Sequence, residues 1–236
     1  FSNITSKQTV IKNTAWIALA NGLSKLLKLV LIIYIARVLG AAEYGKFAFA
    51  LSFASIFVVF SDFGLPSIIT REFAKDRNKR EEFFSVVFLK LLLSFIMLIL
   101  IVIGSFFITY DVSIRKIIWL LAIFTSISNF SEVIKAFFRA RQKIEYESWG
   151  VILESLSVTF VGFLVIFHFP SIINIAYSYL FSVILSSIFF LALFNFKFFP
   201  IKVKLEKKIW IKYLKMSWPL ALAALFSTIY VSIDSV

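Results

Sequence analysis

The sequence predicts an all-α protein, a polytopic bundle of transmembrane helices, and three observations carry this prediction. First, 61% of the 236 residues are hydrophobic and only 16% are charged, and a soluble domain of this length could not cover so much apolar surface. Second, the apolar residues form runs of about 20 residues or more, the length that a helix needs to cross a bilayer. Third, runs such as the one over 91–107 do not alternate between apolar and polar residues, as the strands of a membrane barrel do.

Six long apolar segments and the start of a seventh follow one another along the chain. We expect membrane-spanning helices at residues 14–39, 44–65, 84–109, 114–138, 149–169, 172–195 and from 217 onward. Gly40 follows the first segment, Gly64 and Pro66 lie at the end of the second, and Pro170 separates the fifth from the sixth. Tryptophans lie near several of the expected ends, where indole rings prefer the membrane interface: Trp16, Trp119, Trp149 and Trp218. Several gaps are very short, so consecutive helices should be antiparallel neighbours.

Basic residues are sorted between the gaps, and this sorting predicts the orientation. They collect in the N-terminal tail and in every second gap: Lys7, Lys12, Arg71, Lys75, Arg77, Lys79, Arg80, Lys135, Arg139, Arg141, Lys143, Lys197, Lys202, Lys204, Lys207, Lys208, Lys212 and Lys215. The intervening gaps hold far fewer: Arg37, Lys46, Arg115 and Lys116. Since Lys and Arg concentrate in cytoplasmic loops, we expect a multi-pass protein of the cytoplasmic (inner) cell membrane with its N-terminus inside.

Composition also excludes several classes of function. The net charge of +12 lies in short gaps and not on one polar face, so we expect no nucleic-acid partner. The chain has no cysteine and one histidine, His168, so we expect no metal centre and no cofactor. No phosphate-binding glycine loop or nucleophile with a partnered base is present, so we do not expect an enzyme. The chain starts at Phe1 and stops at Val236 within an apolar run, so we expect a fragment truncated inside a helix.

We divide the chain into a six-helix transmembrane bundle over 1–195, a basic cytoplasmic linker over 196–216, and the truncated start of a second bundle over 217–236. Within the linker, lysines and apolar residues recur on different sides at helical spacing: Lys208, Lys212 and Lys215 against Ile209, Tyr213 and Met216. This pattern predicts an amphipathic helix lying on anionic headgroups. The alternative is a solvated basic linker.

Two lysines in the middle of the first segment are the strongest candidates for function. Lys25 and Lys28 share a helix face with Asn21 and Ser24, because offsets of three and four align. A lysine at the midplane is roughly 15 Å from either interface, too far for its stem to reach water. We expect the four residues to line a central cavity that accepts an anionic group. The alternative is a structural ion pair with a carboxylate on a neighbouring helix.

Carboxylates on other segments are the candidate partners of these lysines. Glu132, with Asn129 one turn away, lies in the fourth segment, and Glu154 lies in the fifth. Each could pair with Lys25 or Lys28 or form a coupling-ion site. The alternative for both is an interfacial carboxylate bonded to a basic gap.

The remaining ionisable residues point less clearly to function. Lys90 lies about two turns from the cytoplasmic edge of the third segment, where we expect its ammonium to snorkel to the interface. Asp62 suggests a helix end, Asp234 lies deep in the seventh segment, and both could contribute to coupling or gating. We expect His168, beside Pro170, to be a surface residue.

Several short motifs follow one another along the chain. Residues 36–40 are Ala-Arg-Val-Leu-Gly, followed at 43–45 by Glu-Tyr-Gly; residues 62–66 are Asp-Phe-Gly-Leu-Pro, with Thr-Arg-Glu at 70–72. Residues 138–143 are Phe-Arg-Ala-Arg-Gln-Lys, and residues 218–220 are Trp-Pro-Leu. In order and spacing these motifs cover nearly the whole chain, and they resemble those of the polysaccharide and O-antigen flippases, Wzx-like transporters of the MATE/MOP superfamily.

The resemblance implies the first six-helix half, and the start of helix 7, of a transporter with 12–14 helices. It implies a cavity between two bundles that opens alternately to each side. The implied cargo and partner is a polyprenyl-pyrophosphate-linked oligosaccharide, moved from the cytoplasmic to the outer leaflet, with other polysaccharide-assembly membrane proteins as further partners. Arg37 falls within a matching motif, where the resemblance implies a role either in gating or in forming the turn after the first helix.

Three other functions remain open at this point. A MATE-like cation-coupled exporter of small amphipathic molecules would favour acidic residues in the cavity, so the lysine pair argues against it and Glu132 for it. A membrane-embedded glycosyltransferase or ligase would need a sizeable extramembrane loop, which the outer gaps do not offer. A structural scaffold would leave the midplane lysines unexplained.

Overall fold

The computed structural model describes residues 6–76, 80–198 and 206–233, and helices make up almost all of them. The helices are α1 (Ser6–Leu39), α2 (Ala41–Ile56), α3 (Val58–Asp62), α4 (Leu65–Lys75), α5 (Arg80–Ile108), α6 (Val112–Ala140), α7 (Ile144–His168), α8 (Ile172–Lys197) and α9 (Lys207–Ile233). The predicted all-α bundle is confirmed.

Five helical stretches of the described chain are long and apolar enough to cross a membrane. They are Ala41–Lys75, Glu81–Ile108, Val112–Ala140, Ile144–His168 and Ile172–Lys197. The expected span at 14–39 lies within α1, a continuous helix of 34 residues that is not among these five. Lys25 and Lys28 interrupt the apolar surface of α1, and its crossing stays a prediction.

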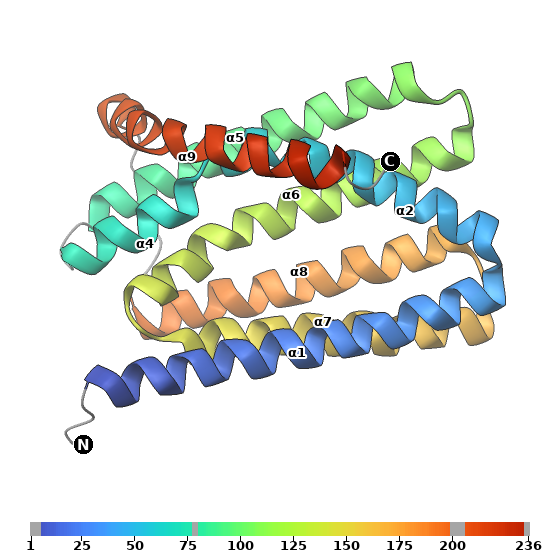
Figure 1. The fold of residues 1–236 in the computed structure, drawn as a ribbon, viewed down its shortest axis with the longest axis horizontal. Helices are drawn as coiled ribbons and strands as arrows, with labels where there is room; N and C mark the ends of the chain where they lie inside the picture. The colour runs from blue at the N-terminus through green and yellow to red at the C-terminus, as the bar shows by residue number, and fades with distance from the viewer. Residues whose placement is uncertain (1–5, 77–79, 199–205, 234–236) are drawn as a thin grey trace.

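The helices run back and forth along one direction, and neighbours in sequence are mostly neighbours in space (Figure 1). α1 lies along α7, α7 along α8, α8 along α6 and α6 along α5, while α2 and α4 cover other parts of α6. The ends of the bundle differ in charge. The described parts of the basic gaps meet at the end where α1 begins, and the short junctions after α1, α5 and α7 lie at the other (Figure 1).

The second expected span is interrupted twice, and the first interruption was not predicted. α2 ends at Ile56, and α3 lasts only from Val58 to Asp62. Phe63 and Gly64 then adopt left-handed conformations with φ of 46° and 69°, and Pro66 lies in the first turn of α4. Glycine permits such a φ, and proline is tolerated where a helix begins. Much of the gap expected after residue 65 is therefore helical.

Apolar side chains pack into two separate clusters, one towards each end of the bundle. The cluster near the short junctions is built around Leu31, Phe47, Ile101, Ile118 and Ile175. The cluster near the basic end contains Ile69, Phe73, Phe83, Phe137, Phe194 and Tyr213. The Phe137 ring packs 4.7 Å from Phe83 in a tilted arrangement and 5.1 Å from Phe194 in an edge-to-face arrangement, measured between ring centroids. The core is therefore divided along the length of the helices.

The basic segment at 207–216 and the apolar stretch from 217 form one helix, α9, which continues through Pro219. As the periodicity predicted, Lys208, Lys212 and Lys215 are exposed, while Ile209 and Tyr213 are buried. The buried side packs against α4 and α5, so protein covers it. The expected boundary between the linker and the second bundle thus falls inside a single helix.

Candidate functional site

Buried polar side chains occupy the space between the two apolar clusters. On α5, α6 and α8 they follow the residues of one cluster and precede those of the other. We call this set the polar layer: Ser24, Ser61, Lys90, Ser94, Thr125, Asn129, Ser131, Ser155, Ser182, Ser186 and Ser187, all less than 9% exposed. Hydroxyl pairs join neighbouring helices within it, with Ser61 2.9 Å from Ser94 and Ser131 2.8 Å from Ser187 between oxygens. Buried polar groups in a membrane protein are costly and mark candidate sites.

One group of polar side chains, which includes Ser24, Ser155 and Ser186 of this layer, joins α1 to α7 and α8. The Lys28 ammonium lies 3.3 Å from Glu154 Oε1, and the Ser186 hydroxyl donates to Glu154 Oε2 at 3.4 Å. Ser24, one turn from Lys28, bonds to the hydroxyl of Ser155. The side chain of Glu154 is 17% exposed and that of Lys28 is 33% exposed. The structural alternative for Lys28, an ion pair with a neighbouring helix, is therefore the arrangement present.

Lys25 and Asn21 share a broad face of α1 with Lys28, but not its ion pair with Glu154. Both are exposed, and within the described part of the chain Lys25 has neither a hydrogen bond nor an ion pair. Three residues turn a helix through about 300°, so Lys25 and Lys28 point about 60° apart. That difference is enough to pair one lysine and leave the other open. A free ammonium halfway along a long helix can receive an anion.

Lys90 is a functional candidate that was not predicted, and its expected snorkelling is wrong. Its side chain is 0% exposed. The ammonium donates to the backbone oxygen of Ser61 at 2.8 Å, to Asp62 Oδ1 at 3.3 Å and to Asn129 Oδ1 at 3.3 Å. A lysine on the interior side of α5 meets acceptors from α3 and α6 before its stem could reach water.

Glu132 and Asn129 do not form one site, because their side chains bond to different partners. Asn129 faces Lys90, whereas Glu132 pairs with Lys135 and, at 2.8 Å, with Arg139. Arg139 also holds Glu147 through two bonds of 2.8 Å. Glu132 therefore belongs to an ion-pair network near the basic end, as its interfacial alternative proposed. It does not reach Lys25 or Lys28.

The other predicted site residues lie apart from these groups. Arg37 is exposed in the last turn of α1. Asp62 ends α3, as expected, but also pairs with Lys90. His168 is exposed, with its Nδ1 3.0 Å from the backbone oxygen of Leu164. Asp234 lies outside the described residues. Among the residues that are described, no group of three His, Cys, Asp or Glu side chains could hold a metal ion.

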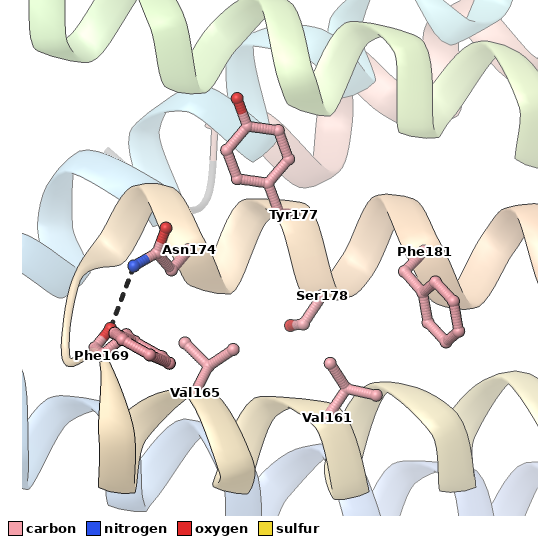
Figure 2. Close-up of a pocket in the computed structure, with 7 residues that line it drawn as sticks. All are labelled: Val161, Val165, Phe169, Asn174, Tyr177, Ser178 and Phe181. Carbon is pink, nitrogen blue, oxygen red and sulfur yellow. Dashed lines mark hydrogen bonds between the residues drawn. The ribbon is translucent and has the colours of Figure 1, made fainter.

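A pocket of about 490 Å³ lies between α7 and α8, near the junction that joins them (Figure 2). Val161 and Val165 of α7 point towards α8, where Ser178 faces them, and Phe181 lies at one side. At the other side, Asn174 donates a hydrogen bond to the Phe169 backbone oxygen at 3.1 Å. None of the lining residues is charged and none was predicted as a site residue, so the pocket is not the expected anion site.

Comparisons with known proteins identify both the family and the fold. The family model described as Polysaccharide biosynthesis protein matches residues 10–236. A MOP superfamily transporter from Pyrococcus furiosus is 18% identical, with a TM-score of 0.71 over 96% of this chain and 54% of its own. An outward-facing multidrug resistance MATE family transporter is 18% identical, with a TM-score of 0.72 over 96% and 54%. A crystal structure of MATE in complex with MaD5 is 17% identical, with a TM-score of 0.74 over 96% and 55%.

These structures share the MATE/MOP transporter fold, and the chain spans about half their length. A comparison with curated proteins finds no match. The resemblance noted from the motifs is confirmed for the family by the matching family model and for the fold by the MATE/MOP structures. Together with the apolar helices, it identifies a multi-pass membrane protein.

Proposed function

The chain belongs to the polysaccharide biosynthesis protein family, and on that premise we propose that it forms the first half of a lipid-linked oligosaccharide flippase. The cargo would be a polyprenyl-pyrophosphate-linked oligosaccharide, carried from the cytoplasmic to the outer leaflet of the cytoplasmic membrane. The N-terminus would lie in the cytoplasm, at the basic end of the bundle. Other polysaccharide-assembly membrane proteins would supply or receive the cargo.

The observation that carries this proposal is the free ammonium of Lys25. A pyrophosphate group cannot enter hydrocarbon alone, because an unpaired charge there is very costly. Lys25 is exposed at the middle of α1 and has no partner in the described part of the chain. It therefore supplies a positive charge that no carboxylate of the described bundle already neutralises.

Lys28 would have a second, conditional role. Its charge is already balanced by Glu154 at 3.3 Å, so an arriving phosphate would have to compete with that carboxylate. The pair is partly exposed, which permits such an exchange. We assign Lys25 to cargo binding and the Lys28–Glu154 pair to fixing α1 against α7.

The proposed transport cycle requires both halves of the transporter. The cavity would lie between this bundle and the second bundle that begins within α9. Rocking of one bundle against the other would expose the headgroup to each side in turn, while the prenyl chain stays in the membrane. No chemical step and no cofactor is needed for this cycle.

The test reverses the charge of Lys25 in the full-length protein, in cells that depend on it for glycan export. A charged hydrogen bond contributes about 1.5–3 kcal/mol, so Lys25→Glu should slow export roughly 10–100-fold and leave lipid-linked glycan in the cytoplasmic leaflet. Lys208→Glu is the matched control, because Lys208 is exposed on α9 outside the proposed cavity. Normal export by a stably expressed Lys25→Glu variant would refute the proposal.

The competing hypothesis of a cation-coupled exporter of small amphipathic molecules loses its main support. That hypothesis depended on Glu132, which pairs with Lys135 and Arg139. An acidic residue already held by two cations is a poor receptor for a cationic drug. Efflux of a cationic dye that is abolished by Glu132→Gln would restore this hypothesis.

A further inference from the structure

The ammonium of Lys90 is enclosed in a site made of oxygen atoms. The side chain is 0% exposed, and its three acceptors come from a backbone carbonyl, a carboxylate and an amide: Ser61, Asp62 and Asn129. A protonated lysine has three N–H donors and a neutral one has two. The three acceptors therefore match the charged form. They also form the kind of oxygen site that binds hard cations.

The break between α3 and α4 creates this site. In a continuous helix the oxygen of Ser61 would accept from the N–H of Leu65. The left-handed turn at Phe63 and Gly64 interrupts that pattern and leaves the carbonyl end of α3 facing Lys90. The end of a helix that carries free carbonyls attracts positive charge, and Asp62 at the same end adds a full negative charge.

The site is buried around the lysine but open at its edge. The side chain of Asp62 is 35% exposed, while that of Lys90 is 0% exposed. An ion from solution could therefore reach the carboxylate if the ammonium were absent. The nearest other charged groups, Glu132 and Lys135 of α6, pair with each other, so neither would replace the missing cation.

We propose that Lys90 is a built-in cation, occupying an oxygen site that would otherwise bind a monovalent metal ion. Because the chain supplies this charge itself, the first bundle needs no bound coupling ion at the α3–α4 break. Shortening the side chain should convert the position into a site for Na⁺ or K⁺. The inference concerns ion use and does not depend on the identity of the cargo.

The experiment measures the thermal stability of purified full-length Lys90→Ala in detergent, in NaCl, KCl or choline chloride at equal ionic strength. We expect the unfolding midpoint to rise by about 5 °C in Na⁺ or K⁺ relative to choline, saturating with concentration as ligand binding does. The wild type should unfold at the same temperature in all three salts. Lys90→Ala combined with Asp62→Asn should lose the response, because the carboxylate is gone.

Two outcomes would overturn the inference. One is a folded Lys90→Ala protein that responds to Na⁺ and K⁺ no more than to choline. The other is a wild type with the same ion response as the variant. If Lys90→Ala does not fold in any salt, Lys90→Gln is measured in its place. Glutamine removes the charge, is one atom shorter than lysine and adds an amide oxygen, so it leaves the oxygen site without its cation and the same results decide the question.

Discussion

Gly150 of α7 lies against the ring of Phe190 on α8, and this contact yields a sharp test of the packing around the candidate site. A Cβ atom at residue 150 would lie 2.1 Å from two ring carbons of Phe190 on α8, where ordinary contacts are 3.4 Å or more. Phe190 is 1% exposed and packs against Phe138, so its ring has little room to move. Glu154 and Ser186 lie one turn away on the same two helices, and they bond to each other.

Gly150→Ala should therefore destabilise the protein through overpacking, which typically costs about 1–3 kcal/mol. Alanine also favours a helix over glycine by about 0.5–1 kcal/mol. Gly22→Ala is the matched control, since it lies within α1 and a Cβ there would meet nothing within 4 Å. The helix preference appears in both variants, so the difference between them, about 1–3 kcal/mol, isolates the contact with Phe190.

The assay is chemical denaturation of the purified full-length variants, with the loss of helix measured by circular dichroism. We expect Gly22→Ala to unfold at or above the wild-type midpoint and Gly150→Ala below it. A second variant, Gly150→Ala with Phe190→Leu, should recover part of the loss. Equal midpoints for the two single variants would refute the close packing of α7 and α8 that positions Glu154.

Two further predictions concern the basic end of the bundle. Burial and the nearby Glu82 carboxylate raise the pKa of Tyr213, so its hydroxyl stays protonated and donates to Glu82 at 3.0 Å. Tyr213→Phe should lower the free energy of unfolding by about 1–3 kcal/mol and weaken the attachment of α9, which faster proteolysis of that helix would show. Arg139 binds Glu147 with two parallel hydrogen bonds that lysine cannot reproduce, so Arg139→Lys should lower the denaturation midpoint. Lys208→Arg, at an exposed position, is the control and should leave the midpoint unchanged.

The sequence predicted the helices well because hydrophobic length and charge sorting are local signals. It also predicted the amphipathic pattern of α9, since periodicity shows directly which residues share a side. It did not show what covers that side, because α4 and α5 are distant in sequence. The first interruption after Ile56 carries no glycine or proline and therefore gave no signal.

The candidate site was only partly predictable, and Lys25, Lys28 and Lys90 show why. Spacing places Lys25 and Lys28 on one broad helix face, but only the rotation of α1 against α7 decides which of them meets Glu154. For Lys90, depth in the membrane suggested snorkelling. Its acceptors lie 28 to 39 positions away in sequence, and no local pattern links them. The signal that could have been followed is a lysine inside an apolar run when the preceding segment ends in an Asp-Phe-Gly turn, here at residues 62–64.

The polar layer has a consequence for how the helices find their alignment along the membrane normal. Packed hydrocarbon chains tolerate a slide of one helical turn, because one leucine or phenylalanine contact replaces another and the lipid offers no hydrophobic penalty. A hydroxyl pair such as Ser131 with Ser187 exists at only one relative height. Removing one such pair would lower the stability only slightly, but it would allow neighbouring helices to align at several heights. The helices would still form, but the protein would no longer adopt one unique packing.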